Sequence, residues 1–149
     1  MGLDMYLDAE RFYFRDETKP KPAEVPAGYE VKTIVVEAAY WRKANQIHKW
    51  FVDNVQGGED DCGSHDVSAE QLTTLKDVCY MVLKEKGKKR QALAKELLPP
   101  QGGFFFGSTD LDDWYWECLR NTVDQIDKVL KSFPHESYRD WSFTYHSSW

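Results

Sequence analysis

Both ends of the chain alternate between apolar and polar residues with a period of two. Near the N-terminus, Leu3, Met5, Leu7 and Ala9 occupy one side of the alternation, and polar residues occupy the other. Residues 141–145 alternate in the same way near the C-terminus. This period is typical of a strand with one buried face. We therefore expect a β-sheet that contains both ends of the chain, with the first and last strands as neighbours.

Helical patterns occupy most of the sequence between these strands. After a proline-rich connection at 18–28 and a second strand over 30–36, the apolar spacing predicts a helix over residues 38–55. Ser68 and Gln71 fit a capping box before a second helix, and a short third helix follows Gly87. A last helix is expected from Ser108 or Thr109. The expected buried stripes of the second and last helices are Leu72, Leu75, Cys79 and Val82, and Leu111, Tyr115, Cys118, Thr122, Ile126 and Val129.

This order of elements predicts an α+β fold. We expect a small antiparallel sheet containing both termini, with about four helices packed mainly on one face. A length of 149 residues corresponds to one globular domain over residues 1–149. The residues between the last two helices, 101–107, are apolar with flanking glycines and are expected to form an extended segment or a tight loop.

Charge and composition narrow the classes of partner. The formal net charge is −6, which disfavours binding to nucleic acid or to an anionic membrane. The sequence has neither a run of about 18 apolar residues nor the pattern of a signal peptide. Three cysteines, an odd number, favour a reducing compartment with free thiols. We therefore expect a cytoplasmic protein without a membrane partner.

Several residues are candidates for chemistry, and each has a plainer explanation. His48 could act as a base or a metal ligand, but no second catalytic group stands at a fixed spacing, so a hydrogen-bonded residue at the boundary of the apolar face is favoured. In the acidic stretch 59–66, Cys62 and His65 form one pair with zinc-like spacing, and a second pair is missing. The glycines of residues 102–108 lack the pattern of a phosphate loop. We expect no metal and no cofactor.

Aromatic residues are the most informative excess, at 15% of the chain. Trp114, Tyr115 and Trp116 are consecutive on a predicted helix, so their rings point 100° apart and cannot all face one core. At least one ring should therefore lie at a surface, where tryptophan and tyrosine often mark interfaces. The alternative is that a small sheet leaves room for rings on several sides. The candidate binding surface comprises Trp41, Arg42, Asn45, His48, Lys49, Trp114 and Trp116.

Three stretches of the sequence resemble a family of small proteins encoded by bacteriophages and prophages. They are MGLDMYL at 1–7, YWRKANQIHKWFVDN at 40–54 and LPPQGGFFFGS at 98–108. The resemblance implies a phage or prophage origin and a bacterial cytoplasm. It supplies no activity and no catalytic residues.

These observations leave three functional hypotheses. The first is a non-enzymatic phage protein that binds a host bacterial protein with a basic surface, for example in counter-defence or host takeover. The second is a domain that binds or hydrolyses a small, nucleotide-like ligand in a pocket between His48 and residues 102–108. The third is a DNA mimic that presents carboxylates from two acidic stretches. The sequence does not decide whether the protein also forms a homo-oligomer. The acidic residues of the third hypothesis are Asp60, Asp61, Asp110, Asp112 and Asp113.

Overall fold

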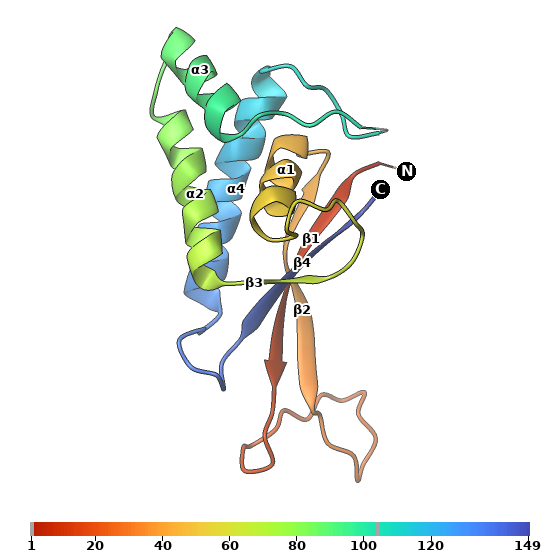
Figure 1. The fold of residues 1–149 in the computed structure, drawn as a ribbon. Helices are drawn as coiled ribbons and strands as arrows, with labels where there is room; N and C mark the ends of the chain where they lie inside the picture. The colour runs from red at the N-terminus through yellow and green to blue at the C-terminus, as the bar shows by residue number, and fades with distance from the viewer. Residues whose placement is uncertain (1, 104) are drawn as a thin grey trace.

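The computed structural model describes residues 2–103 and 105–149, and within them it contains four strands and four helices (Figure 1). The predicted α+β class is confirmed. In chain order the elements are β1 (Asp4–Phe12), β2 (Thr33–Arg42), α1 (Asn45–Asn54), β3 (His65–Val67), α2 (Ala69–Leu83), α3 (Gly87–Leu97), α4 (Asp113–Ser132) and β4 (Ser142–Ser148).

The four strands form one antiparallel sheet in the order β2-β1-β4-β3. The first and last strands pair directly, from Asp4 opposite Ser148 to Glu10 opposite Ser142, so the prediction that they are neighbours is confirmed. Strands β1 and β2 also pair along their length, with a shift in register between Leu7 and Asp8. Both ends of the chain thus meet in the centre of the sheet.

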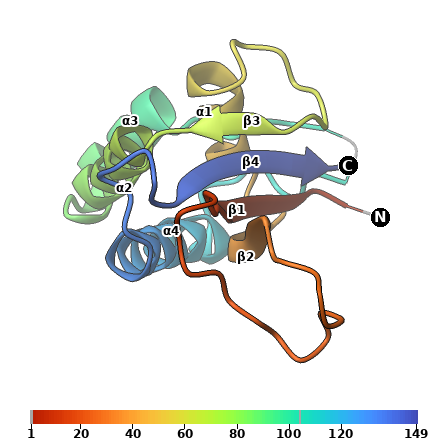
Figure 2. The same ribbon diagram turned by 90° about the horizontal axis from the view of Figure 1, so that it is seen from below.

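One face of the sheet supplies the core. Leu3, Met5 and Leu7 are fully buried, as is Tyr145 on β4, while their neighbours along each strand point the other way. The helices gather on the side of these buried residues (Figures 1 and 2). No helix of the described residues is long and apolar enough to cross a membrane.

The two long helices follow the predicted stripes. All four stripe residues of α2 are fully buried, and Tyr115, Cys118, Thr122, Ile126 and Val129 of α4 are buried as well. Leu111 lies before α4 and is only half-buried. The capping box is also confirmed, because Ser68 Oγ accepts a hydrogen bond from the Gln71 amide at 3.0 Å and the Ser68 amide donates to Gln71 Oε1 at 2.9 Å.

The helix predicted over residues 38–55 is wrong in its first part. Strand β2 continues to Arg42, and α1 begins only at Asn45. Pairing with β1 overrides the helical spacing, because Ala39 and Trp41 lie opposite Leu7 and Met5 and become buried with them. Lys43, with a φ of 52°, is in the left-handed region and separates the strand from the helix.

Two further boundaries differ from the sequence prediction. The N-cap of α4 is Asp112, whose carboxylate accepts a hydrogen bond from the Tyr115 amide at 3.0 Å, and not Ser108 or Thr109. Residues 65–67 of the predicted acidic loop form the short strand β3. The predicted segment 101–107 contains neither helix nor strand in its described part, and residue 104 lies outside the described residues.

Candidate functional site

Three of the sequence-predicted binding residues meet around a cleft. It has a volume of about 250 Å³ and lies between the end of β2 and the first turns of α4. Trp41 and Arg42 line it from β2, and Trp114 lines it from α4. The Trp114 side chain is 52% exposed, whereas Trp41 is buried and its indole N–H donates to Thr122 Oγ1 at 2.9 Å. The cleft therefore offers an exposed ring beside a guanidinium.

The three consecutive aromatic residues of α4 diverge, as their spacing predicts. Trp114 points to solvent, and Tyr115 points into the core, where its hydroxyl donates to the Leu98 carbonyl at 2.7 Å. Trp116 is half-buried below the guanidinium of Arg90, which lies 4.9 Å from the ring centroid. Lys49 lies apart from all of them and pairs with Asp53 at 2.9 Å.

The remaining two predicted residues, Asn45 and His48, are buried on α1. The side chain of Asn45 donates to the carbonyls of Phe106 and Ser108, at 3.1 and 2.9 Å. Its side-chain oxygen accepts from the Gln101 amide at 3.0 Å. Asn45 thus fastens the loop after α3 to the start of α1, and its polar atoms are used in doing so.

His48 is the centre of a buried chain of hydrogen bonds. Its Nδ1 lies 2.6 Å from the hydroxyl of Tyr145 on β4, and its Nε2 lies 2.9 Å from Asp60 Oδ1. Gln101 donates to the other oxygen of Asp60 at 3.2 Å. The pattern is satisfied when Tyr145 donates to Nδ1 and Nε2–H donates to the carboxylate. These hydrogen bonds connect α1, β4 and the loop that follows α1.

The protonation of His48 is controlled mainly by burial. Loss of water lowers the pKa of His48, although the neighbouring Asp60 carboxylate partly opposes the shift. Burial likewise raises the pKa of Tyr145 well above its usual value. Because His48 is fully buried and both ring nitrogens are bonded, it cannot reach a substrate in this conformation. The Phe106 ring packs against the imidazole in a T-shaped arrangement, with the two ring centroids 5.6 Å apart, so the ligand-pocket hypothesis gains no support here.

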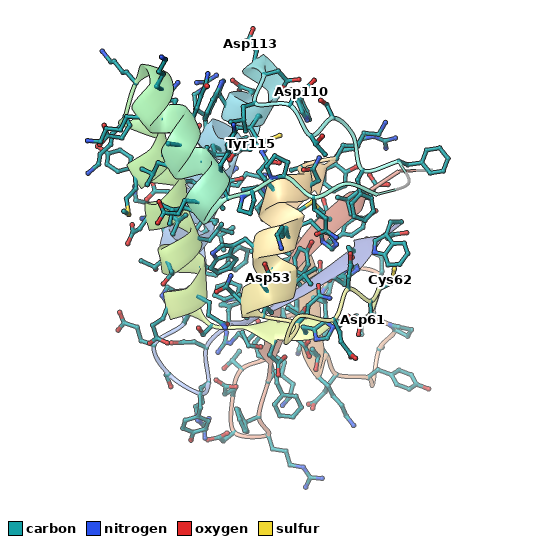
Figure 3. All side chains as sticks on the ribbon, turned by 45° about the horizontal axis from the view of Figure 1, so that its top comes forward. Asp53, Asp61, Cys62, Asp110, Asp113 and Tyr115 are labelled. Carbon is teal, nitrogen blue, oxygen red and sulfur yellow. The ribbon has the colours of Figure 1, made fainter. Side chains whose placement is uncertain are left out.

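The carboxylates of the DNA-mimic hypothesis fall into two separate groups. Figure 3 places Asp110 and Asp113 near the N-terminal end of α4, and Asp61 on the loop between α1 and β3, well apart from them. Asp61 accepts a hydrogen bond from His65 at 2.7 Å, which helps to lower the pKa of Asp61. Cys62 in the same loop is exposed. Within the described residues, no three potential ligands converge on a metal position.

The sheet face that points away from the helices carries a row of aromatic rings. Tyr6 on the central strand β1 stacks on His146 of β4, with centroids 4.8 Å apart, and contacts Tyr40 of β2 at 5.4 Å. His146 Nε2 lies 3.2 Å from Asp8 Oδ2, and the Tyr40 hydroxyl donates to Asp4. We call this side of the sheet, formed by the outward residues of all four strands, the open face.

The open face is strongly acidic. Among its described strand residues, Arg42 is the one lysine or arginine, and it lies 3.3 Å from Asp4. The polar side of the N-terminal alternation indicated part of this surface, but the sequence could not show which residues of the other strands lie beside it. The carboxylates of the open face are Asp4, Asp8, Glu10, Glu37 and Asp66.

A wide groove continues from one end of the open face. It has a volume of about 1370 Å³ and lies between the sheet, the first turns of α2 and the loop from α4 to β4. Glu10 and Asp66 belong both to the open face and to the groove, while Glu70, Glu136 and Asp140 add carboxylates from the other walls. Sequence reasoning missed the groove because its walls come from distant parts of the chain.

Comparison with known proteins gives no further assignment: no family model, curated protein or solved structure matches this chain.

Proposed function

We propose that the chain is a non-enzymatic binding protein of a bacteriophage or prophage, and that it acts on a host protein in the bacterial cytoplasm. The observation that carries the proposal is the open face, where five carboxylates stand against one guanidinium and no helix covers the strands among the described residues. The resemblance of three sequence stretches to phage and prophage proteins supports the origin.

The chemistry of this face indicates the partner's charge. Excess carboxylates attract a surface rich in lysine and arginine and repel nucleic acid and anionic lipid. The aromatic row of Tyr40, Tyr6 and His146 supplies apolar area in the middle of the charged surface. Rings at the centre with charges around them are the usual composition of a protein–protein interface.

The exposed tryptophan predicted from the sequence extends this surface around the edge of β2. Tyr40 and Arg42 belong to the open face and also line the cleft that holds Trp114. A partner that covers Tyr40 would therefore come within reach of the Trp114 ring. A tryptophan ring that becomes buried under a partner often contributes much of the binding energy.

Affinity capture from bacterial lysate, quantified by mass spectrometry, tests the proposal. The binding variant combines Glu37→Lys on the open face with Trp114→Ala. The matched control combines Asp77→Lys with Tyr80→Ala on α2, which are exposed and lie away from the open face. A partner captured by the wild type and by the control, but lost with the binding variant, is the expected result. If both variants retain every enriched protein, the open face is not the binding surface.

A further inference from the structure

We infer that the groove at the end of the open face is the docking site for a lysine- or arginine-rich segment of the partner protein. The inference rests on the proposed function and goes further, because it assigns the main contact to the groove and states the chemistry of the segment that enters it.

The size of the groove fits a polypeptide segment better than a small molecule. Sites for small molecules commonly have volumes of roughly 300–1000 Å³, and the groove reaches about 1370 Å³. Its walls come from the end of the sheet at Glu10, from the start of α2 at Glu70 and from the loop at Glu136. A segment lying between these walls would meet a carboxylate on each side.

The carboxylates of the groove are available to a partner. Among the described residues, the side chains of Glu10, Asp66, Glu70 and Glu136 have no hydrogen-bond or ion-pair partner. Asp140 alone is engaged, and it accepts a hydrogen bond from the Ser137 amide at 3.0 Å. Neither lysine nor arginine lines the groove in the described part of the chain. This negative potential is complementary to cationic side chains.

Two arginines lie near the groove without neutralising it. Arg11 pairs with Glu17 and Arg139 pairs with Asp16, each at 3.0 Å. Arg11 also donates to the Arg139 carbonyl at 3.2 Å and so ties β1 to the loop from α4 to β4. The ion pairs and the hydrogen bond of these two arginines hold one wall of the groove in place. A wall that is already ordered loses less conformational entropy when a partner binds.

Aromatic side chains favour lysine and arginine over a small inorganic cation. Phe12, Tyr138 and Trp141 line the groove, and the first two are 51% and 81% exposed. Such rings accept the aliphatic stems and the cationic ends of long basic side chains. The molecule already contains this contact, because the Arg139 guanidinium lies 4.6 Å from the ring centroid of Phe14, beside Tyr138.

Peptide binding to the full chain tests the inference directly. The probe is a fluorescein-labelled peptide in which arginine alternates with glycine and serine, and the reference peptide carries glutamate in place of arginine. Fluorescence anisotropy is measured at low and at physiological ionic strength, because exposed charge pairs are screened by salt. We expect the arginine peptide to bind and the glutamate peptide not to bind. Amide NMR shifts should change over residues 66–71 and 135–143.

Charge-matched variants separate the groove from the overall charge. The groove variant is Glu70→Gln with Glu136→Lys, and the control is Glu96→Gln with Asp124→Lys; all four positions are exposed, and both pairs change the net charge equally. We expect the groove variant to bind the arginine peptide roughly tenfold more weakly than the wild type does. The control should change binding little. Equal weakening by both pairs, or shifts spread over the whole surface, would overturn the inference.

The same variants distinguish failure of this inference from failure of the proposed function. If a host protein is captured by the wild type and by the groove variant, but is lost with Glu37→Lys and Trp114→Ala, the open face binds it and the groove does not. If no host protein is captured, the proposed function fails whatever the peptide does. If the captured partner is lost with the groove variant but retained by its control, the result supports both the proposed function and the docking of the partner in the groove.

Discussion

The side-chain amide of Gln125 on α4 forms two hydrogen bonds with the backbone of Tyr40 on β2. Tyr40 N–H donates to Gln125 Oε1 at 3.0 Å, and Gln125 Nε2 donates to the Tyr40 carbonyl at 2.8 Å. The amide thereby occupies the position of a neighbouring strand. Because β2 is an edge of the sheet, this pair covers backbone groups that another chain could otherwise use for pairing.

Replacement of Gln125 should expose this edge. For Gln125→Ala we expect a loss of about 1 kcal/mol in the free energy of unfolding, because two hydrogen bonds are exchanged for bonds with water. We also expect more self-association at high concentration than in the wild type. Urea unfolding and sedimentation velocity measure the two effects. The control is Asp124→Ala, a substitution at the exposed neighbouring position. If the two variants have the same stability and the same degree of self-association, Gln125 does not protect the edge of the sheet.

The buried histidine predicts a dependence of stability on pH. In the unfolded chain a histidine titrates near pH 6.5, whereas burial lowers the pKa of His48 in the folded chain. As the pH falls below about 6.5, the unfolded state therefore binds a proton before the folded state does, and stability declines. Urea unfolding between neutral and mildly acidic pH measures this decline. In His48→Gln the decline in stability should be smaller. If the stability of both proteins declines equally with pH, His48 is not the group responsible.

The three thiols should differ sharply in reactivity. Cys62 is exposed, whereas Cys79 and Cys118 are buried. Burial raises the pKa of Cys118 to about 12 and that of Cys79 further, so neither forms a thiolate near neutral pH. We expect a thiol reagent to modify one cysteine rapidly and the other two only after unfolding. Cys62→Ser should remove the rapid phase, and a rapid phase that persists would place a second cysteine at the surface.

The hydrogen bond between the Trp41 indole and Thr122 offers a test of the core. Thr122→Val keeps the shape but leaves the buried indole N–H without its acceptor, which should cost about 1–3 kcal/mol of folding free energy. Thr122→Ser keeps the hydroxyl and loses one methyl group, so its cost should be smaller. Denaturant unfolding monitored by tryptophan fluorescence compares the two. A larger loss for serine than for valine would mean that packing, and not the hydrogen bond, dominates at this position.

Local patterns predicted the helices that carry their own signals. The capping box at Ser68 and the buried stripes of α2 and α4 follow from spacing within a single segment. The same reasoning failed at residues 38–42, where both helical spacing and strand pairing bury apolar residues. The choice between them depends on β1, which lies more than 25 positions earlier in the chain. Three-residue β3 is too short for any period to be recognised.

The candidate surface was only partly predictable for the same reason. Sequence spacing predicted that at least one of the rings of Trp114, Tyr115 and Trp116 would be exposed, and Trp114 is exposed. It could not place Tyr6 beside His146 or Asp8 beside Thr144, because β4 follows β1 by more than 130 positions. His48 was predicted to be a hydrogen-bonded residue at the boundary of the core. Its hydrogen bonds agree, but it is fully buried, and spacing could not identify Tyr145 and Asp60 as its partners.

The position of β4 has a consequence for the order in which the chain can fold. Strands β1 and β2 pair with each other directly and need no later segment, but β3 joins the sheet only through β4. The last of the four strands in chain order is therefore the one that unites the two parts of the sheet. Until β4 pairs with β1, the apolar sides of β1 and of the helices lack a partner that closes the core. We expect this sheet to form slowly, because its decisive contacts join segments that lie far apart in the sequence.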